Sequence, residues 1–270
     1  METTININKE RPLWKWVLVF VASFILGVIG YVSLQSLALI GAAPWLIVIA
    51  TVALIGLYAL GVKLFEGYWP RDLGMGKLLP HTAIGIVVGF VYMTLVVSTI
   101  VAAGCATMGY YDFEWQRILQ ALVVFFMVGV GEEIIFRGVI FRQIDERWNI
   151  WAALIVSALL FGFTHMPNNG ATWWSSMAIA IEAGLLLGAA YKWSGTLWLP
   201  IGIHWAWNFT QGNIYGAAVS GTEAGDSVLV INAYGPDIVT GGTFGPEASI
   251  VAVIFGIIIT LVFLGCRYRQ

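Results

Sequence analysis

About eight long apolar segments, separated by Gly, Pro and charged residues, constrain the fold of this chain more than any other feature. They cover about 13–38, 43–62, 81–103, 115–141, 150–166, 173–191, 197–215 and 248–265. A bilayer core of about 30 Å needs roughly 20 apolar residues per helix, and backbone polar groups in lipid must be satisfied internally. The sequence therefore predicts an all-α fold, a polytopic membrane helix bundle of about eight transmembrane helices, with residues 1–270 forming a single membrane domain.

Composition narrows the class of protein further. Hydrophobic residues make up 59% of the chain and charged residues only 10%, whereas soluble domains carry about 25% charged residues. A disordered chain and an ordinary cytosolic enzyme are therefore excluded. The net charge of −2 provides no basic patch for nucleic acid, so the expected partners are the lipid bilayer and membrane-associated molecules.

Basic residues predict the orientation because they fall in alternate connections: Lys9, Arg11 and Lys15; Lys63, Arg71 and Lys77; Arg142 and Arg147; Lys192; Arg267 and Arg269. Residues 104–114 and 216–247 contain Asp and Glu but no Lys or Arg. The positive-inside rule then places both termini in the cytoplasm and these two loops outside a multi-pass cell-membrane protein. Cys105 lies outside and Cys266 inside in this topology, so we expect no disulfide between them.

Ionisable residues inside apolar segments are costly and are functional candidates by default. The fourth segment contains Glu132, Glu133 and Arg137. Glu133 and Arg137 are four residues apart on one helix face and suit an ion pair. Glu132 points about 100° away, so it is free to line a cavity as a general base. The alternative is an ion-pair cluster that only locks helix packing.

Two histidines lie in or at the ends of other apolar segments. His165 ends Phe161–His165, and His204 shares a helix face with Asn208. Together with Glu132 they would supply a base for water, an imidazole to orient it and two donors for an oxyanion. Glu132, His165 and His204 would also suit catalytic zinc. No HExxH motif is present, and spacing alone does not decide between a metal site and a metal-free one.

These residues form three motifs in order, and through them the chain resembles the CPBP family, the CAAX protease and bacteriocin-processing intramembrane endopeptidases. EExxxR stands at Glu132–Arg137, FxxxH at Phe161–His165 and HxxxN at His204–Asn208. The resemblance covers about 130–210, within a motif core of about 115–215.

The resemblance implies a glutamate-dependent peptidase, although the family is often labelled metalloprotease. Glu132 would activate water, His165 would hold it, and His204 and Asn208 would stabilise the oxyanion, with Glu133 and Arg137 in support. We favour a site without zinc or another cofactor. The implied substrate is a membrane-associated or lipidated peptide or protein.

Two other classes of function stay open. One is a non-catalytic protein of the same fold, such as a bacteriocin immunity or scaffold protein, and the other is a proton-coupled transporter. A complete set of four candidate catalytic residues favours the enzyme. Glu182 and the 216–247 loop receive no assigned role. The topology places Glu132 toward the cytoplasm and His165 toward the outside, so their convergence requires a tilted helix, a broken helix or a shifted boundary.

Overall fold

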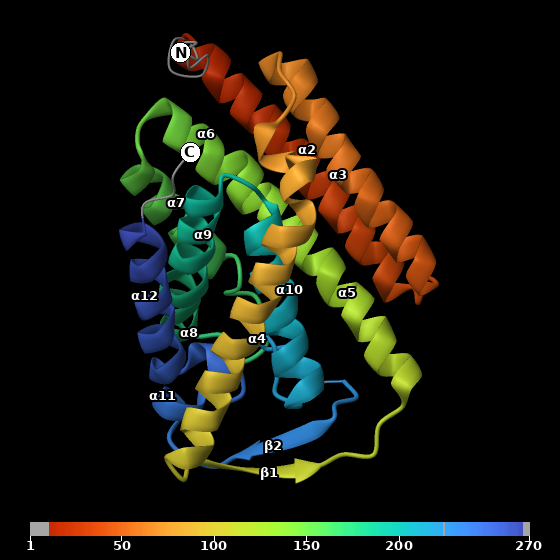
Figure 1. The fold of residues 1–270 in the computed structure, drawn as a ribbon, viewed down its shortest axis with the longest axis vertical. Helices are drawn as coiled ribbons and strands as arrows, with labels where there is room; N and C mark the ends of the chain where they lie inside the picture. Colours follow the sequence, from red (N-terminus) through yellow and green to blue (C-terminus); the bar gives the residue numbers. More distant parts are fainter. Residues whose placement is uncertain (1–10, 224, 267–270) are drawn as a thin grey trace.

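The computed structural model describes residues 11–223 and 225–266, which form a helical bundle with almost no sheet (Figure 1). Its longer elements are α2 (Leu13–Leu39), α3 (Pro44–Glu66), α4 (Leu78–Ala102), α5 (Trp115–Glu133) with η3 (Ile134–Phe141) and α6 (Arg142–Arg147), α7 (Ile150–Phe163), α8 (Trp173–Ile179) with η4 (Ala180–Leu185) and α9 (Leu186–Ser194), α10 (Trp198–Phe209) with η5 (Thr210–Ile214), and α12 (Ile250–Gly265). Short turns of helix are η1 (Arg71–Leu73), η2 (Met75–Lys77), α11 (Asp237–Thr240) and η6 (Pro246–Ala248). The predicted all-α, polytopic membrane fold is confirmed.

Helix lengths differ from the uniform spans that the sequence suggested. Among the described residues, 5 helices are long and apolar enough to cross a membrane: Leu13–Leu39, Pro44–Glu66, Met75–Ala102, Trp115–Arg147 and Trp173–Ser194. The remaining apolar helices are shorter, with 14 residues in α7, 12 in α10 and 16 in α12. Because nearly every residue of α10 is buried, this helix packs among its neighbours rather than against lipid.

The helix Trp115–Arg147 has 33 residues. At 1.5 Å per residue it is about 50 Å long, which exceeds a hydrocarbon core of about 30 Å. It therefore tilts strongly, and Figure 1 shows it crossing the bundle diagonally beside the steeper α4 and α10. Eight residues in its second half form the π-helix η3, a rare geometry that often occurs at functional sites.

Two strands connect loops that the sequence analysis left without structure. β1 (Ala106–Tyr110) pairs antiparallel with β2 (Leu229–Ala233), with Ala106 opposite Ala233. This pairing joins the two predicted outer loops at one end of the bundle. The start of α2 and the end of α12 lie at the opposite end (Figure 1).

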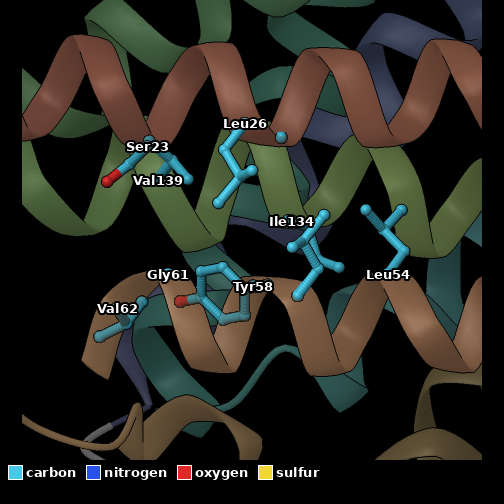
Figure 2. Close-up of a pocket in the computed structure, with 10 residues that line it drawn as sticks. Ser23, Leu26, Leu54, Tyr58, Gly61, Val62, Ile134 and Val139 are labelled. Carbon is cyan, nitrogen blue, oxygen red and sulfur yellow. The ribbon is translucent and has the colours of Figure 1, made fainter. Parts of the chain in front are cut away.

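Close helix approach fixes the positions of α10 and η3. A Cβ atom on Gly85 of α4 would lie 2.5 Å from the carbonyl oxygen of Leu199, so α4 and α10 pack backbone to backbone. On the other side, α2 and α3 enclose η3. Figure 2 shows Leu26 of α2 and Leu54 of α3 beside Ile134 in this apolar contact. The fourth segment is thereby held between two layers of helices.

Candidate active site

The four predicted catalytic side chains line one cavity of about 590 Å³. Glu132 comes from α5, His165 from the turn after α7, and His204 and Asn208 from α10. The walls add apolar side chains of α2, α5, η3 and α7, and a short stretch of the 216–247 loop: Phe24, Val28, Val124, Phe125, Val128, Ile135, Phe136, Ile140, Leu160, Val219, Ser220 and Thr222. A polar centre inside an apolar pocket is typical of a ligand-binding site.

The convergence has a geometric cause. The tilt of Trp115–Arg147 carries Glu132 inward, since this residue lies near the middle of a helix much longer than the bilayer is thick. The helix α7 ends at Phe163 after only 14 residues, so His165 stands in the turn that follows this helix. Both residues line the same cavity, so the mismatch that the predicted segment boundaries implied between Glu132 and His165 is not present.

Glu133 is the centre of a buried charge network. Its Oε1 accepts a hydrogen bond from Arg137 Nη1 at 2.9 Å and another from His204 Nδ1 at 2.9 Å. Glu133 and Arg137 are both 0% exposed. The i,i+4 pair expected from the sequence is present, and His204 is a third member that spacing did not reveal.

Arg137 has further partners on the neighbouring helix. Its Nη2 donates to the carbonyl oxygens of Ala183 at 3.3 Å and Gly184 at 3.1 Å. Both carbonyls belong to the π-helix η4, where a widened turn leaves backbone oxygens open to a side-chain donor. Arg137 thus links the fourth segment to the sixth.

The hydrogen bond to Glu133 also assigns the ring nitrogens of His204. A carboxylate oxygen accepts, so Nδ1 carries a proton. The other nitrogen, Nε2, lies 3.9 Å from Oε2 of Glu132. His204 therefore contacts one glutamate of the pair through Nδ1 and faces the other through Nε2.

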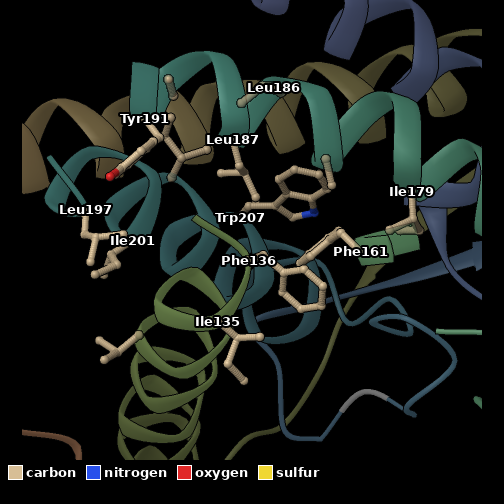
Figure 3. Close-up of a cluster of buried hydrophobic side chains, with 14 of the residues drawn as sticks. Ile135, Phe136, Phe161, Ile179, Leu186, Leu187, Tyr191, Leu197, Ile201 and Trp207 are labelled. Atoms are coloured by element: carbon tan, nitrogen blue, oxygen red, sulfur yellow. The ribbon is translucent and has the colours of Figure 1, made fainter. Parts of the chain in front are cut away.

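Phe161, the first residue of the second motif, packs at the centre of the site. The guanidinium carbon of Arg137 lies 4.6 Å from its ring centroid, and the ring of His204 lies 5.9 Å away. Its carbonyl oxygen accepts a hydrogen bond from His165 Nδ1 at 2.8 Å, which leaves Nε2 of His165 to face other groups. Figure 3 shows Phe161 beside Phe136 in the buried cluster next to the cavity.

The loop of residues 216–247 adds an acid that was not among the predicted site residues. Glu247 is 1% exposed and lines a smaller cavity of about 20 Å³ together with His165, His204, Asn208 and Ser220. Its carboxylate accepts hydrogen bonds from Gln211 Nε2 at 2.7 Å and from the backbone N–H of Ser220. Burial raises the pKa of Glu247, and the hydrogen bonds from Ser220 and Gln211 oppose that rise.

Ser220, which bonds to Glu247, also lines the large cavity. It has a φ of 48° and is the one non-glycine residue with a positive φ in the described part of the chain. Its carbonyl oxygen accepts from Asn168 Nδ2 at 2.8 Å. Glu247 and Asn168 therefore hold a strained turn against the turn that carries His165, and no local sequence pattern signals this long-range contact.

Glu182 lies outside this constellation. It is 0% exposed and accepts a hydrogen bond from Tyr92 at 2.6 Å, and it is absent from the residues that line the large cavity. Its contacts are those of a packing carboxylate within the bundle.

The candidate zinc ligands are Glu132, His165 and His204, and they do not form a metal-binding cluster. Within the residues that the structure describes, no three His, Cys, Asp or Glu side chains are grouped closely enough to hold a metal ion. Glu132 Oε2 and His204 Nε2 are 3.9 Å apart, and His165 is turned so that Nδ1 bonds to its own helix. His165 therefore offers only its Nε2 atom to the cavity.

Fold and site together define a multi-pass α-helical membrane protein with a polar cavity inside its bundle. Residues 114–210 match the family model described as Type II CAAX prenyl endopeptidase Rce1-like. This segment contains all three motifs, and the match supports the membership of the CPBP family that the motifs predicted. The match supports a CAAX-type, intramembrane protease-like function.

One curated relative carries no functional description of its own. A protein of Escherichia coli, described as an uncharacterized 24.3 kDa protein, is 29% identical over 89 residues. The aligned part is 32% of this chain and 40% of that protein, so the chain spans about two fifths of the length of this relative.

Proposed function

We propose that this protein is an intramembrane endopeptidase that hydrolyses a peptide bond of a membrane-associated or lipidated peptide with glutamate-activated water. The observation that carries the proposal is the shared cavity, which brings Glu132, His165, His204 and Asn208 together from three separate spans. A protein that only used the fold as a scaffold would have no need for a general base, an imidazole and two donors around one space.

The proposed reaction begins with water held by Nε2 of His165. Oε2 of Glu132 takes one proton from that water as its oxygen attacks the scissile carbonyl carbon. The tetrahedral oxyanion then accepts hydrogen bonds from the side-chain amide of Asn208 and from Nε2 of His204. The C–N bond breaks as the intermediate collapses, and the proton on Glu132 passes to the leaving amine.

Glu133 and Arg137 support this chemistry without touching the substrate. Glu133 holds Nδ1 of His204 at 2.9 Å, and this aims Nε2 into the cavity. Because Nδ1 is protonated, Nε2 can donate to the oxyanion only when the ring carries both protons. Arg137 keeps Glu133 in place through the 2.9 Å ion pair.

Hydrolysis in ¹⁸O-labelled water tests the function and identifies the substrate in the same experiment. Native membranes incubated with the purified protein should yield peptides whose new C-terminal carboxylate carries ¹⁸O, because water supplies that oxygen. Mass spectrometry would identify these peptides. If no peptide gains label above a sample treated with Glu132→Gln, the peptidase assignment is wrong.

Asn208→Ala should lower kcat by about 10²–10³-fold while KM stays nearly constant. The reason is that an oxyanion donor acts in the transition state and contributes little to substrate binding. Steady-state kinetics on a peptide identified by ¹⁸O labelling would measure both constants. A change confined to KM would remove Asn208 from the oxyanion role.

Chelation complements this measurement, because in a zinc site Glu132, His165 and His204 would be the ligands and Asn208 would not touch the metal. We expect the purified protein to keep its activity after exhaustive dialysis against a strong chelator and to contain far less than one zinc per chain. Zinc that leaves together with activity and restores it on return would recast the two histidines as metal ligands.

We also propose that both termini are cytoplasmic and that residues 216–247 lie outside. The proposal is supported by the antiparallel pairing of β1 with β2, which brings the two loops without Lys or Arg to the same end of the bundle. Lys9, Arg267 and Arg269, which contributed to this orientation, lie outside the described residues.

Cysteine labelling would test the orientation in intact cells. In a background with Cys105→Ser and Cys266→Ser, an impermeant thiol reagent should label Gly225→Cys and should not label Gly76→Cys. Both glycines are exposed, so access to the reagent is decided by the side of the membrane. The reverse pattern would show that the chain is inserted the other way.

A further inference from the structure

Tyr31 contacts the proposed catalytic base from a part of the chain outside all three motifs. It lies on α2, well before the matched residues 114–210. Its hydroxyl donates a hydrogen bond of 3.0 Å to Oε1 of Glu132. Tyr31 is 8% exposed and also lines the large cavity.

The fourth segment is shaped to receive this ring. A Cβ atom on Gly131 would lie 2.2 Å from Cδ2 of Tyr31, so the residue before Glu132 has to be a glycine for the ring to fit. The ring therefore lies against the helix backbone next to the carboxylate. This packing restricts the hydroxyl to one approach to Glu132.

The two oxygens of Glu132 consequently differ. Oε1 is occupied by Tyr31, whereas Oε2 is buried, accepts no hydrogen bond from a described residue and lies 3.9 Å from Nε2 of His204. A carboxylate that could rotate freely would offer either oxygen in several directions. The contact with Tyr31 removes that freedom.

We propose that Tyr31 is a positioning residue, which fixes the Glu132 carboxylate so that Oε2 is the oxygen that takes the proton from water. This inference rests on the proposed function. In the reaction Tyr31 transfers no proton. Its O–H donates to Oε1 while Glu132 is a carboxylate, and it still donates to the carbonyl-type oxygen after Oε2 has gained the proton.

Tyr31→Phe tests the role because it keeps the ring against Gly131 and removes only the hydroxyl. We expect kcat to fall about 10- to 100-fold, the range for loss of one hydrogen bond to a charged group, with KM little changed. Kinetics on a peptide identified by ¹⁸O labelling would separate the two constants. A kcat equal to that of the wild type would overturn the positioning role.

Tyr92→Phe is the matched control. Tyr92 is also a buried tyrosine that donates to a membrane carboxylate, with its hydroxyl 2.6 Å from Glu182, but it does not line the cavity. Its substitution should lower the melting temperature and leave kcat unchanged. Equal losses of kcat in both variants would mean that the effect of Tyr31→Phe is a general effect of stability.

A double-mutant cycle on melting temperature tests the contact independently of activity. The shifts caused by Tyr31→Phe and Glu132→Ala should not add, because each removes one side of the same hydrogen bond. Additive shifts would disprove the contact and the inference with it. If instead the shifts are coupled but Glu132→Gln remains active, the contact stands, while the peptidase mechanism and the positioning role both fail.

Discussion

Glu132→Gln should reduce turnover to background, a loss of about 10²–10⁴-fold, the range that general-base catalysis contributes. Gln keeps the shape of the side chain, and its amide oxygen can still accept the hydrogen bond from Tyr31, but it cannot take a proton from water. The melting temperature should therefore stay close to that of the wild type. Loss of ¹⁸O-labelled products without loss of folded protein is the expected combination.

Glu133→Gln is the internal control for this prediction. The two glutamates are adjacent in sequence, yet Glu132 faces the cavity whereas Glu133 is sealed between Arg137 and His204. We expect Glu133→Gln to lower both folded yield and activity. If the two variants behaved alike in yield and in activity, separate roles for the two carboxylates would have no basis.

The sequence could predict the helices because hydrophobic length is a local property. Each apolar segment contains a helix, and the fold class is confirmed. Helix length and tilt could not be predicted in the same way. The last six residues of the helix Trp115–Arg147 are mostly polar or charged. The helix continues through them because Arg142 bonds to Glu66 of α3 at 2.6 Å.

The β1–β2 pair was missed for a related reason. Strand formation here depends on a partner more than 100 residues away in sequence, and neither loop shows a clear alternation of polar and apolar residues. Thr107 faces Asn232, and Gly109 faces Val230. Only the assembled bundle brings these two loops close enough to pair.

The candidate site likewise contains some residues that local spacing could predict and some contacts that only the folded bundle makes. Spacing of four residues on a helix was enough to select Glu133 with Arg137 and His204 with Asn208, because such pairs share a face. The link between His204 and Glu133 needed the packing of α10 against α5, which the sequence does not reveal. Tyr31 and Glu247 were missed since a tyrosine in an apolar helix and an acid in a loop are ordinary in those places.

Arg137→Ala should destabilise the protein by about 3–5 kcal/mol, because breaking a buried ion pair strands the remaining charge. Here the stranded group is Glu133, and the carbonyl oxygens of Ala183 and Gly184 also lose a donor. We expect a sharp fall in folded yield from membranes. Size-exclusion chromatography and melting temperature would measure it.

Arg117→Ala provides the comparison. Arg117 is also paired with a glutamate, at 3.1 Å from Glu114, but its side chain is 63% exposed, and exposed pairs contribute only about 0–1 kcal/mol. Its loss should therefore leave folded yield nearly unchanged. If Arg137→Ala folded as well as Arg117→Ala, the Glu133–Arg137–His204 network could not be what holds the fourth, sixth and seventh apolar segments together. The orientation of His204 toward Glu132 would then need another cause.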